Sequence, residues 1–175
     1  MNLLDTIIET DRLILKPMTL DFSEDIFKEF TSEITKYMYP KSAIDVEETF
    51  EFIKNSIEKL KKGIDLQMVI INKKQNEFIG CIGIHNLNTL EPELGIWTKK
   101  SSHKNGFGLE AMTGLIEWAH KNIKFNYLIY PVDKRNIASR RLPEKNNGKI
   151  MKEKKMIGMA GNELDEYVYW IYPKN

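Results

Sequence analysis

Hydrophobic residues recur at both strand and helix spacing in the first third of the chain. The aliphatic run from Arg12 to Met18, which contains Pro17, predicts a first strand. Between Leu20 and Phe30 the apolar residues recur at helical spacing, which predicts a helix. A turn-rich loop with two tyrosines and Pro40 follows. A second helix is predicted from Asp45, with Gly63 as its C-cap and one apolar face formed by Val46, Phe50, Ile53, Ile57 and Leu60.

The middle of the chain predicts three strands and a helix. Two β-rich runs begin at Leu66 and Phe78, and the polar residues 73–76 between them predict a hairpin. A third strand is predicted from Glu91 to Thr98, and a helix follows Gly108. The buried face of that helix is predicted to consist of Met112, Leu115, Ile116 and Ala119.

The last third adds a strand from Tyr127, a short helix in residues 136–148 that is interrupted at Pro143, and a last strand from Glu166. The lysine-rich segment 149–155 suits an edge strand. No internal repeat or linker-like composition divides the chain. We therefore expect one α/β domain over residues 1–175, with helices packed on a mixed sheet.

Composition excludes several classes of partner. The 26 basic and 25 acidic residues nearly cancel, so nucleic acid is not the expected partner. No apolar run approaches the roughly 20 residues that span a bilayer, so membrane insertion is not expected. The single Cys81 and the absence of a charged-then-apolar leader favour a reducing cytoplasm. Cys81 lies in an apolar strand and is expected to be a buried structural thiol, and the three histidines have no spacing that suits a metal.

The segment from Glu93 to Ala119 carries the chemistry, because a strand runs into a glycine loop that opens a helix. The first amides of a helix have no intrahelical partner and carry the positive end of the helix dipole. Gly106 and Gly108 would let an anion approach the main chain closely. A phosphorylated cofactor is the functional hypothesis, and a tight strand-to-helix turn is the structural alternative. The loop lacks the Gly-Lys-Ser/Thr of a P-loop and the early position of a Rossmann loop.

This segment resembles the acetyl-CoA pyrophosphate loop of the GNAT superfamily of N-acetyltransferases. His103-Lys104-Asn105-Gly106-Phe107-Gly108 is similar to the family pattern Arg/Gln-x-x-Gly-x-Gly/Ala, with His103 in place of the usual Arg or Gln. Glu110 and Ala111 match a Glu-Ala pair on the family's helix. Downstream, Asn136-Ile-Ala-Ser139 and Lys145-Asn-Asn-Gly148 match the Asn-x-x-Ser and Lys-x-x-Gly signals in the same order. The variant is similar to the RimJ/RimL-like branch, and the resemblance covers residues 10–172.

The resemblance implies a mostly antiparallel sheet, splayed between two middle strands, with helices on both faces. It also implies direct acetyl transfer from acetyl-CoA to a primary amine, without a covalent enzyme intermediate. The amine would be a protein N-terminus or a small molecule; the RimJ/RimL-like branch acetylates both. The expected cofactor-binding residues are Leu94, Ile96, Trp97, Thr98, His103, Lys104, Asn105, Gly106, Phe107, Gly108, Leu109, Asn136, Ser139 and Arg140.

The resemblance places Ser139 near the thioester sulfur, where its hydroxyl would protonate the leaving thiolate. Glu93, on the strand that should line the cleft, is the first candidate for the base that deprotonates the amine, and Glu91 and His85 compete for this role. Tyr37, Tyr39 and His85 are candidate substrate contacts, with Met38 in the same loop as the two tyrosines. Asn136 could also be only a helix cap, and Arg140 and Arg141 could be solvated rather than bound to phosphate.

Two questions stay open from the sequence. A catalytically silent acyl-CoA-binding or regulatory domain would keep the same loop without turning over an amine. The oligomeric state is either monomer or homodimer, because the aromatic residues of the last strand could pack inside the protein or against a second copy. These residues are Tyr167, Tyr169, Trp170 and Tyr172.

Overall fold

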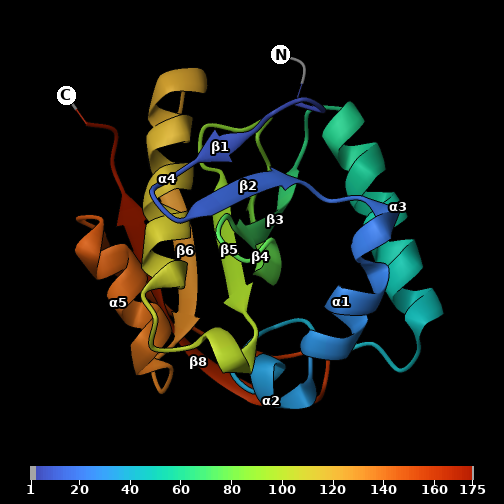
Figure 1. The fold of residues 1–175 in the computed structure, drawn as a ribbon. Coiled ribbons are helices and arrows are strands. Elements are labelled where there is room, and N and C mark those ends of the chain that lie inside the picture. Colours follow the sequence, from blue (N-terminus) through green and yellow to red (C-terminus); the bar gives the residue numbers. More distant parts are fainter. Residues whose placement is uncertain (1–2, 175) are drawn as a thin grey trace.

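One mixed sheet organises residues 3–174, which are the residues that this computed structural model describes. Its strand order is β1-β2-β3-β4-β5-β6-β8-β7 (Figure 1). Neighbouring strands are antiparallel except β5 and β6, which are parallel. The strands are β1 (Ile8–Glu9), β2 (Leu13–Pro17), β3 (Leu66–Asn72), β4 (Glu77–His85), β5 (Glu93–Thr98), β6 (Leu128–Asp133), β7 (Lys149–Ile157) and β8 (Glu163–Ile171).

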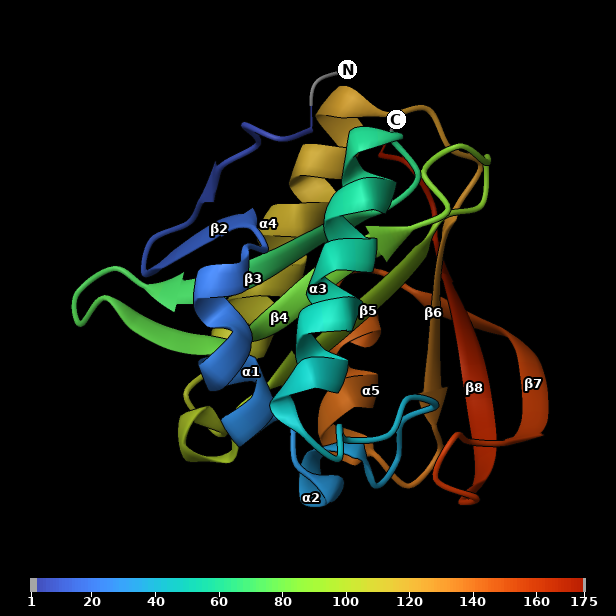
Figure 2. The same ribbon diagram turned by 90° about the vertical axis from the view of Figure 1, so that its right-hand side faces the viewer.

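Helices cover both faces of the sheet. The helices α4 (Phe107–Asn122) and α5 (Ile137–Lys145) lie on one face, and α1 (Ser23–Glu29) and α3 (Val46–Lys61) lie on the other (Figure 2). A short helix, α2 (Ser32–Thr35), and the 3-10 turns Leu20–Phe22 and Lys100–Ser102 occupy connections. We call the two sides of the sheet the α4 face and the α3 face.

Strand alternation divides the apolar side chains between two clusters. Leu13, Leu15, Met68, Ile82 and Leu94 belong to the larger cluster, together with the buried stripe of α4. The smaller cluster contains Met18, Ile53, Val69, Phe78 and Cys81. Because successive strand residues point to opposite faces, one register fixes both clusters.

The sheet is splayed between β5 and β6. Their only residue pair in the described chain is Glu93 with Ile129, and the Ile129 amide donates to the Pro92 carbonyl at 2.8 Å. Beyond this pair β5 and β6 form no further ladder. The main-chain groups of Leu94–Thr98 that face β6 therefore have no strand partner. We call this region, Leu94–Thr98 opposite Tyr130–Asp133, the splay.

The predicted fold class is confirmed, and most predicted elements are present. Asp45 caps α3, and its side chain accepts a hydrogen bond from the Glu48 amide at 3.0 Å. The predicted edge strand is β7, at the end of the sheet. The predicted interruption of the helix at Pro143 is wrong, since α5 continues to Lys145 with Pro143 buried inside it. Without an N–H, Pro143 cannot donate to the Ser139 carbonyl, so α5 lacks one internal hydrogen bond there. The two-residue strand β1 was not predicted.

Candidate active site

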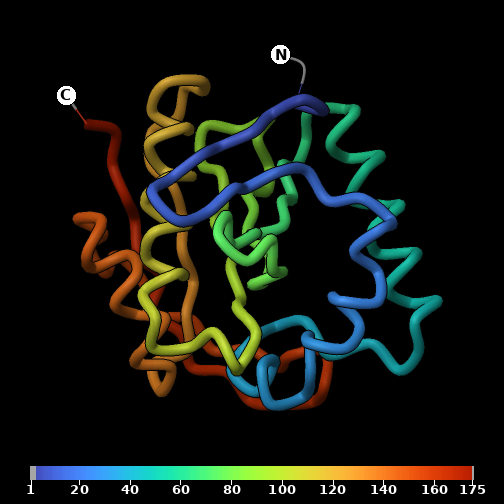
Figure 3. The backbone as a smooth tube through the Cα atoms, in the orientation of Figure 1, coloured from blue at the N-terminus to red at the C-terminus, as the bar shows by residue number. Residues whose placement is uncertain are grey.

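The loop between β5 and α4 is shaped by two residues with positive φ. Lys104 has φ 63° and Gly106, the N-cap of α4, has φ 78°. The left-handed conformation favours glycine at residue 106. Glu110 is the first residue whose amide donates within the helix, to the Gly106 carbonyl at 3.1 Å. The amides of Phe107, Gly108 and Leu109 therefore have no intrahelical partner, and such a helix start suits an anion. The loop and its turn into α4 can be followed in Figure 3.

Side chains brace this loop from within. The Asn105 amide group donates to the carbonyls of Ser102 and His103 at 3.3 and 3.1 Å. The Nε2 atom of His103 lies 3.0 Å from the Thr98 carbonyl, so its ring is turned back toward the end of β5. His103 therefore stabilises the strand-to-loop junction and does not extend over the helix start.

The β5 residues predicted to bind the cofactor point to different faces. Leu94 is buried in the larger core cluster, and Ile96 packs against that cluster. The ring of Trp97 points to the α3 face, where its centre lies 4.8 Å from that of Phe30 and 5.8 Å from that of Phe78. The side chains of Ile96, Thr98 and Leu142 lie beside Gly108. Strand β5 can thus offer a ligand its main-chain edge, while most of its side chains hold the core.

At the other side of the splay, the first turn of α5 contains Asn136 and Ser139. The Asn136 side chain accepts a hydrogen bond from the Ser139 amide at 3.2 Å, so Asn136 is the N-cap of α5. The Ser139 hydroxyl is hydrogen-bonded to the phenol of Tyr130, a buried residue of β6. Burial raises the pKa of Tyr130 to about 12, although the bond with Ser139 acts in the opposite direction. The sequence interpretation missed Tyr130, which it treated only as part of an apolar strand.

Arg140 is held by contacts within the protein. Its Nη1 atom donates to the Lys134 carbonyl at 3.2 Å, its Nε atom lies 3.4 Å from the Tyr169 hydroxyl, and its guanidinium lies 5.0 Å from the centre of the Tyr167 ring. The neighbouring Arg141 is exposed. Arg140 therefore stabilises the α5–β8 packing in this structure.

On the α3 face, His85 lies beside Glu93 at the start of the splay. The two residues are register partners on β4 and β5. The Nδ1 atom of His85 lies 3.2 Å from the buried Asp65 carboxylate, and its Nε2 atom lies 3.1 Å from the Gln67 amide nitrogen. Burial raises the pKa of Glu93, and the charges of His85 and Lys154 offset part of this increase.

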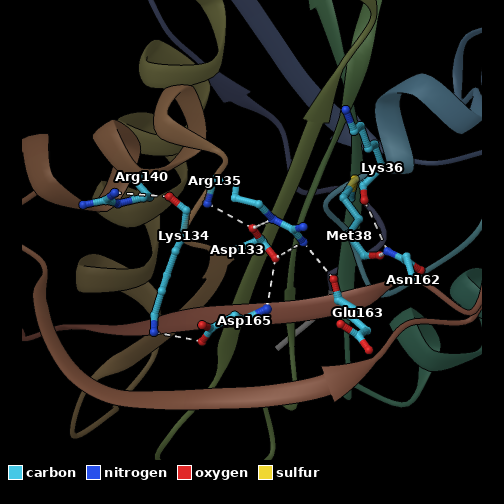
Figure 4. A network of polar contacts seen from close by, with 9 residues as sticks. All are labelled: Lys36, Met38, Asp133, Lys134, Arg135, Arg140, Asn162, Glu163 and Asp165. Atoms are coloured by element: carbon cyan, nitrogen blue, oxygen red, sulfur yellow. Dashed lines mark hydrogen bonds and ion pairs between the residues drawn. The ribbon is translucent and has the colours of Figure 1, made fainter.

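A second carboxylate, Glu166 of β8, lies on the same face and was missed by the sequence interpretation. Only 6% of Glu166 is exposed, and its pKa is raised by burial and by the nearby charges of Glu93 and Asp133, against the opposing charge of Lys154. Within residues 3–174, neither the Glu93 nor the Glu166 carboxylate forms a hydrogen bond or an ion pair. Asp133 differs because Arg135 and the Asp165 amide bind it (Figure 4). The one available signal was strand alternation, which puts Glu166 on the face opposite Tyr167 and Tyr169.

The loop after α2 is tied to the β7–β8 turn below this face. The Asn162 side chain donates to the carbonyls of Lys36 and Met38 at 3.2 and 3.3 Å, as Figure 4 shows. The Met159 amide donates to the Tyr39 carbonyl at 2.8 Å. The Tyr37 ring stacks on the Arg135 guanidinium, 5.0 Å away, while Tyr39 is half exposed. The structure thus brings Tyr37 to the Asp133–Arg135 pair and leaves Tyr39 at the surface.

The remaining features concern the cysteine, metal-ligating side chains, membrane-crossing helices and the aromatic residues near the C-terminus. Cys81 is buried, and burial raises its thiol pKa, as expected for a structural cysteine. Among residues 3–174, no group of His, Cys, Asp and Glu side chains is arranged to hold a metal ion. None of the helices in this range is both long enough and apolar enough to cross a membrane. In the last strand, Tyr169 is buried, and the ring of Trp170 stacks on that of Tyr127 with 3.7 Å between the ring centres. Tyr172, just after this strand, is 45% exposed.

Comparisons with known proteins identify the family. The profile described as "Acetyltransferase (GNAT) domain" matches residues 12–149. YoaA, an uncharacterized N-acetyltransferase of Bacillus subtilis strain 168, is 27% identical over 139 residues, which is 78% of each chain. The chain therefore belongs to the GNAT acetyltransferase family.

Solved structures share this fold. RimL, a ribosomal L7/L12 α-N-protein acetyltransferase in complex with coenzyme A, superposes with a TM-score of 0.85 at 16% identity, covering 96% of this chain and 98% of RimL. An acetyltransferase from Salmonella typhimurium that modifies the N-terminal serine of L7/L12 gives a TM-score of 0.83 at 16% identity, covering 97% of this chain and 100% of that one. As a member of this family, the protein is an acetyltransferase that uses acetyl-CoA and transfers the acetyl group to an amine.

Proposed function

We propose that the splay holds the two substrates on opposite sides, acetyl-CoA from the α4 face and a primary amine from the α3 face. The observation that carries the proposal is the single residue pair, Glu93 with Ile129, after which β5 and β6 separate toward the starts of α4 and α5. The anion-binding loop, an unpaired strand edge, a serine hydroxyl and two unpaired carboxylates all adjoin this one region.

The donor half follows from main-chain chemistry. Amides of residues 104–109 bind the diphosphate of acetyl-CoA at the start of α4. The free edge of Leu94–Thr98 then pairs with the amide groups of the pantetheine arm, as a strand would. On this route the thioester would lie within the splay, between Ser139 of α5 and Glu93 of β5. The Nδ2 group of Asn136 has no partner within residues 3–174 and can donate to the same arm.

The acceptor half must bind a cation and then remove its proton. A protonated amine is attracted to Glu93 and Glu166, and one of these carboxylates takes a proton from it, directly or through water. The neutral amine attacks the thioester carbonyl, so a C–N bond forms and the C–S bond breaks. The departing thiolate takes a proton from the Ser139 hydroxyl, which is replenished through Tyr130 and solvent. The attacking nitrogen releases its second proton to solvent, so the products are an amide and free CoA.

The acceptor is a primary amine, either a protein N-terminal α-amine or a small-molecule amine. The carboxylate pair matters more for lysine-like amines, whose pKa is about 10.4, than for α-amines, whose pKa is about 8. We expect the acceptor chain to contact Tyr37, Tyr39 and His85. We place this activity in the cytoplasm because the lone Cys81 is buried and unpaired, as suits a reducing compartment.

The test is release of CoA thiol from acetyl-CoA across a panel of amines. The panel contains short peptides with free N-termini, the same peptides blocked at the N-terminus, polyamines and aminoglycosides. Thiol release with one class, and mass-shifted product from that class only, supports the proposal and identifies the acceptor. Saturable acetyl-CoA binding without release from any amine would contradict it and indicate a silent acyl-CoA-binding domain.

A further inference from the structure

The N-terminal hairpin reaches the coenzyme loop through Arg12, which lies just before β2. The Nε atom of Arg12 donates to Glu110 Oε2 at 2.6 Å, and Nη1 donates to the Asn105 carbonyl at 3.0 Å. The centre of the guanidinium lies 4.6 Å from the centre of the Phe107 ring. One side chain therefore contacts three residues of the loop and the first turn of α4, more than 90 positions later in the sequence.

The hairpin is itself fixed to the helix. Glu110 Oε1 accepts from the Thr10 hydroxyl at 2.6 Å and from the Arg12 amide at 2.7 Å. Burial raises the pKa of Glu110, but the hydrogen bonds from Thr10 and Arg12 outweigh burial, so the pKa is below its ordinary value. Glu110 is therefore ionised at neutral pH and holds the arginine in one orientation.

The third guanidinium nitrogen is directed at the loop. Arg12 Nη2 would lie 3.4 Å from a Cβ atom at Gly106, and it makes no hydrogen bond or ion pair within residues 3–174. A free N–H pair of a fixed cation therefore lies beside the left-handed residue that opens α4. His103 contributes no such group over the helix start, since its ring is turned back toward the Thr98 carbonyl.

We propose that Arg12 is a positioning residue of the coenzyme site, and this inference rests on the proposed function of the loop. It holds Asn105 and Phe107 so that the loop amides converge, and it places its Nη2 group where the diphosphate of CoA binds. Arginine suits this role better than lysine, because a planar fork can bond Glu110, Asn105 and an anion at once.

The test compares three variants by calorimetric binding of CoA and of 3′-dephospho-CoA. Arg12→Gln should raise the dissociation constant of both ligands tenfold or more, and Arg12→Lys should raise it by a smaller factor. The matched control is Lys73→Gln. Lys73 donates to the Thr10 carbonyl at 2.6 Å and pairs with Glu9 at 3.0 Å, so it anchors the same hairpin without touching the loop. Lys73→Gln should bind both ligands like the wild type.

Each outcome decides the question. Unchanged CoA affinity in both Arg12 variants would overturn the inference, as would an equal loss in Lys73→Gln. A loss confined to CoA would mean that Arg12 binds the 3′-phosphate and not the diphosphate. In steady-state assays, Arg12→Gln should raise the KM for acetyl-CoA with kcat retained at saturation, which a general folding defect would not do. A wild-type protein that binds no CoA would contradict the proposed function instead.

Discussion

The two sides of the splay are built in different ways. On the proposed donor side, the loop from His103 to Glu110 is one continuous segment whose main chain would bind the coenzyme. Its carboxylate, Glu110, accepts three hydrogen bonds, from Thr10 and Arg12. On the acceptor side, Glu93 and Glu166 come from separate strands and make no hydrogen bond or ion pair within residues 3–174.

This difference matches the chemistry of the two substrates. The coenzyme is constant and anionic, so a rigid, preorganised site binds it at little entropic cost. The amine arrives as a cation and must lose a proton, which requires carboxylates that are not already occupied. Carboxylates that are withdrawn from water without a partner reduce stability, so their presence here is consistent with the proposed use in catalysis.

The largest effect should come from breaking the donor side at Gly106. Gly106→Asp adds a side chain at a left-handed position and a negative charge beside the diphosphate, so CoA affinity should fall by about 100-fold or more. Gly63→Asp is the control, because Gly63 also has positive φ, 67°, but follows Lys62, the C-cap of α3, far from the loop. Calorimetry measures both, and wild-type affinity in Gly106→Asp would refute the assignment of the loop.

The next largest effect should separate the two acceptor carboxylates. Changing the carboxylate that acts as the base to glutamine should lower kcat by about 100-fold, in line with general-base catalysis. Burial raises the pKa of both groups, so the wild-type rate should fall on the acid side above the ordinary carboxyl range, where the base becomes protonated. Because the two charges interact, the apparent pKa belongs to the pair.

Rate profiles against pH for Glu93→Gln and Glu166→Gln assign the role. The variant that loses the acid limb has lost the base. If both variants keep the wild-type profile, the base is neither carboxylate, and Glu91, His85 or solvent must take the proton. Asp65→Asn then tests His85, since Asp65 orients the imidazole.

A smaller effect is expected at Ser139. Ser139→Ala should lower kcat by about tenfold while the KM for acetyl-CoA changes little, because the hydroxyl acts on the departing thiolate and the Asn136 cap bonds only the main chain of residue 139. Tyr130→Phe should reproduce part of this loss, since its phenol bonds Ser139. An unchanged kcat in Ser139→Ala would leave Ser139 with a structural role only.

The smallest effect concerns stability. The raised pKa of Glu166 means that the folded state binds its proton more readily than the unfolded state. This contribution to stability is present at acidic pH and is lost as the pH rises through the raised pKa. Glu166→Gln should therefore increase the melting temperature by about 2 °C at neutral pH, and by less in acid. Thermal unfolding at several pH values checks this, and a lower melting temperature at neutral pH would contradict it.

The sequence predicted the structure of the segment from β5 to α4 better than it predicted the surroundings of Glu93. A strand, a glycine loop and a helix are contiguous, so their chemistry can be inferred from neighbouring residues such as Gly106 and Glu110. The acceptor side depends on which strands lie together: Glu166 reaches the site of Glu93 only because β8 pairs with β6 next to the splay. Tyr130 and Arg12 were missed for the same reason, since their partners Ser139 and Glu110 are defined by tertiary contacts. Pro143 is buried inside α5, and tertiary packing of this kind cannot be inferred from hydrophobic periodicity.

The single Glu93–Ile129 pair has a consequence for how long the molecule survives in a cell. The sheet consists of two groups of strands, β1–β5 and β6, β8 and β7. One residue pair, between β5 and β6, joins the two groups. In the proposed binding mode, the coenzyme pairs with the free edge of β5 as an additional strand would. A ligand that binds only the native state stabilises that state against unfolding, and the stabilisation grows with the ligand concentration. Nutrient supply, by setting the acetyl-CoA pool, would then adjust the resistance of this protein to proteases as well as its turnover.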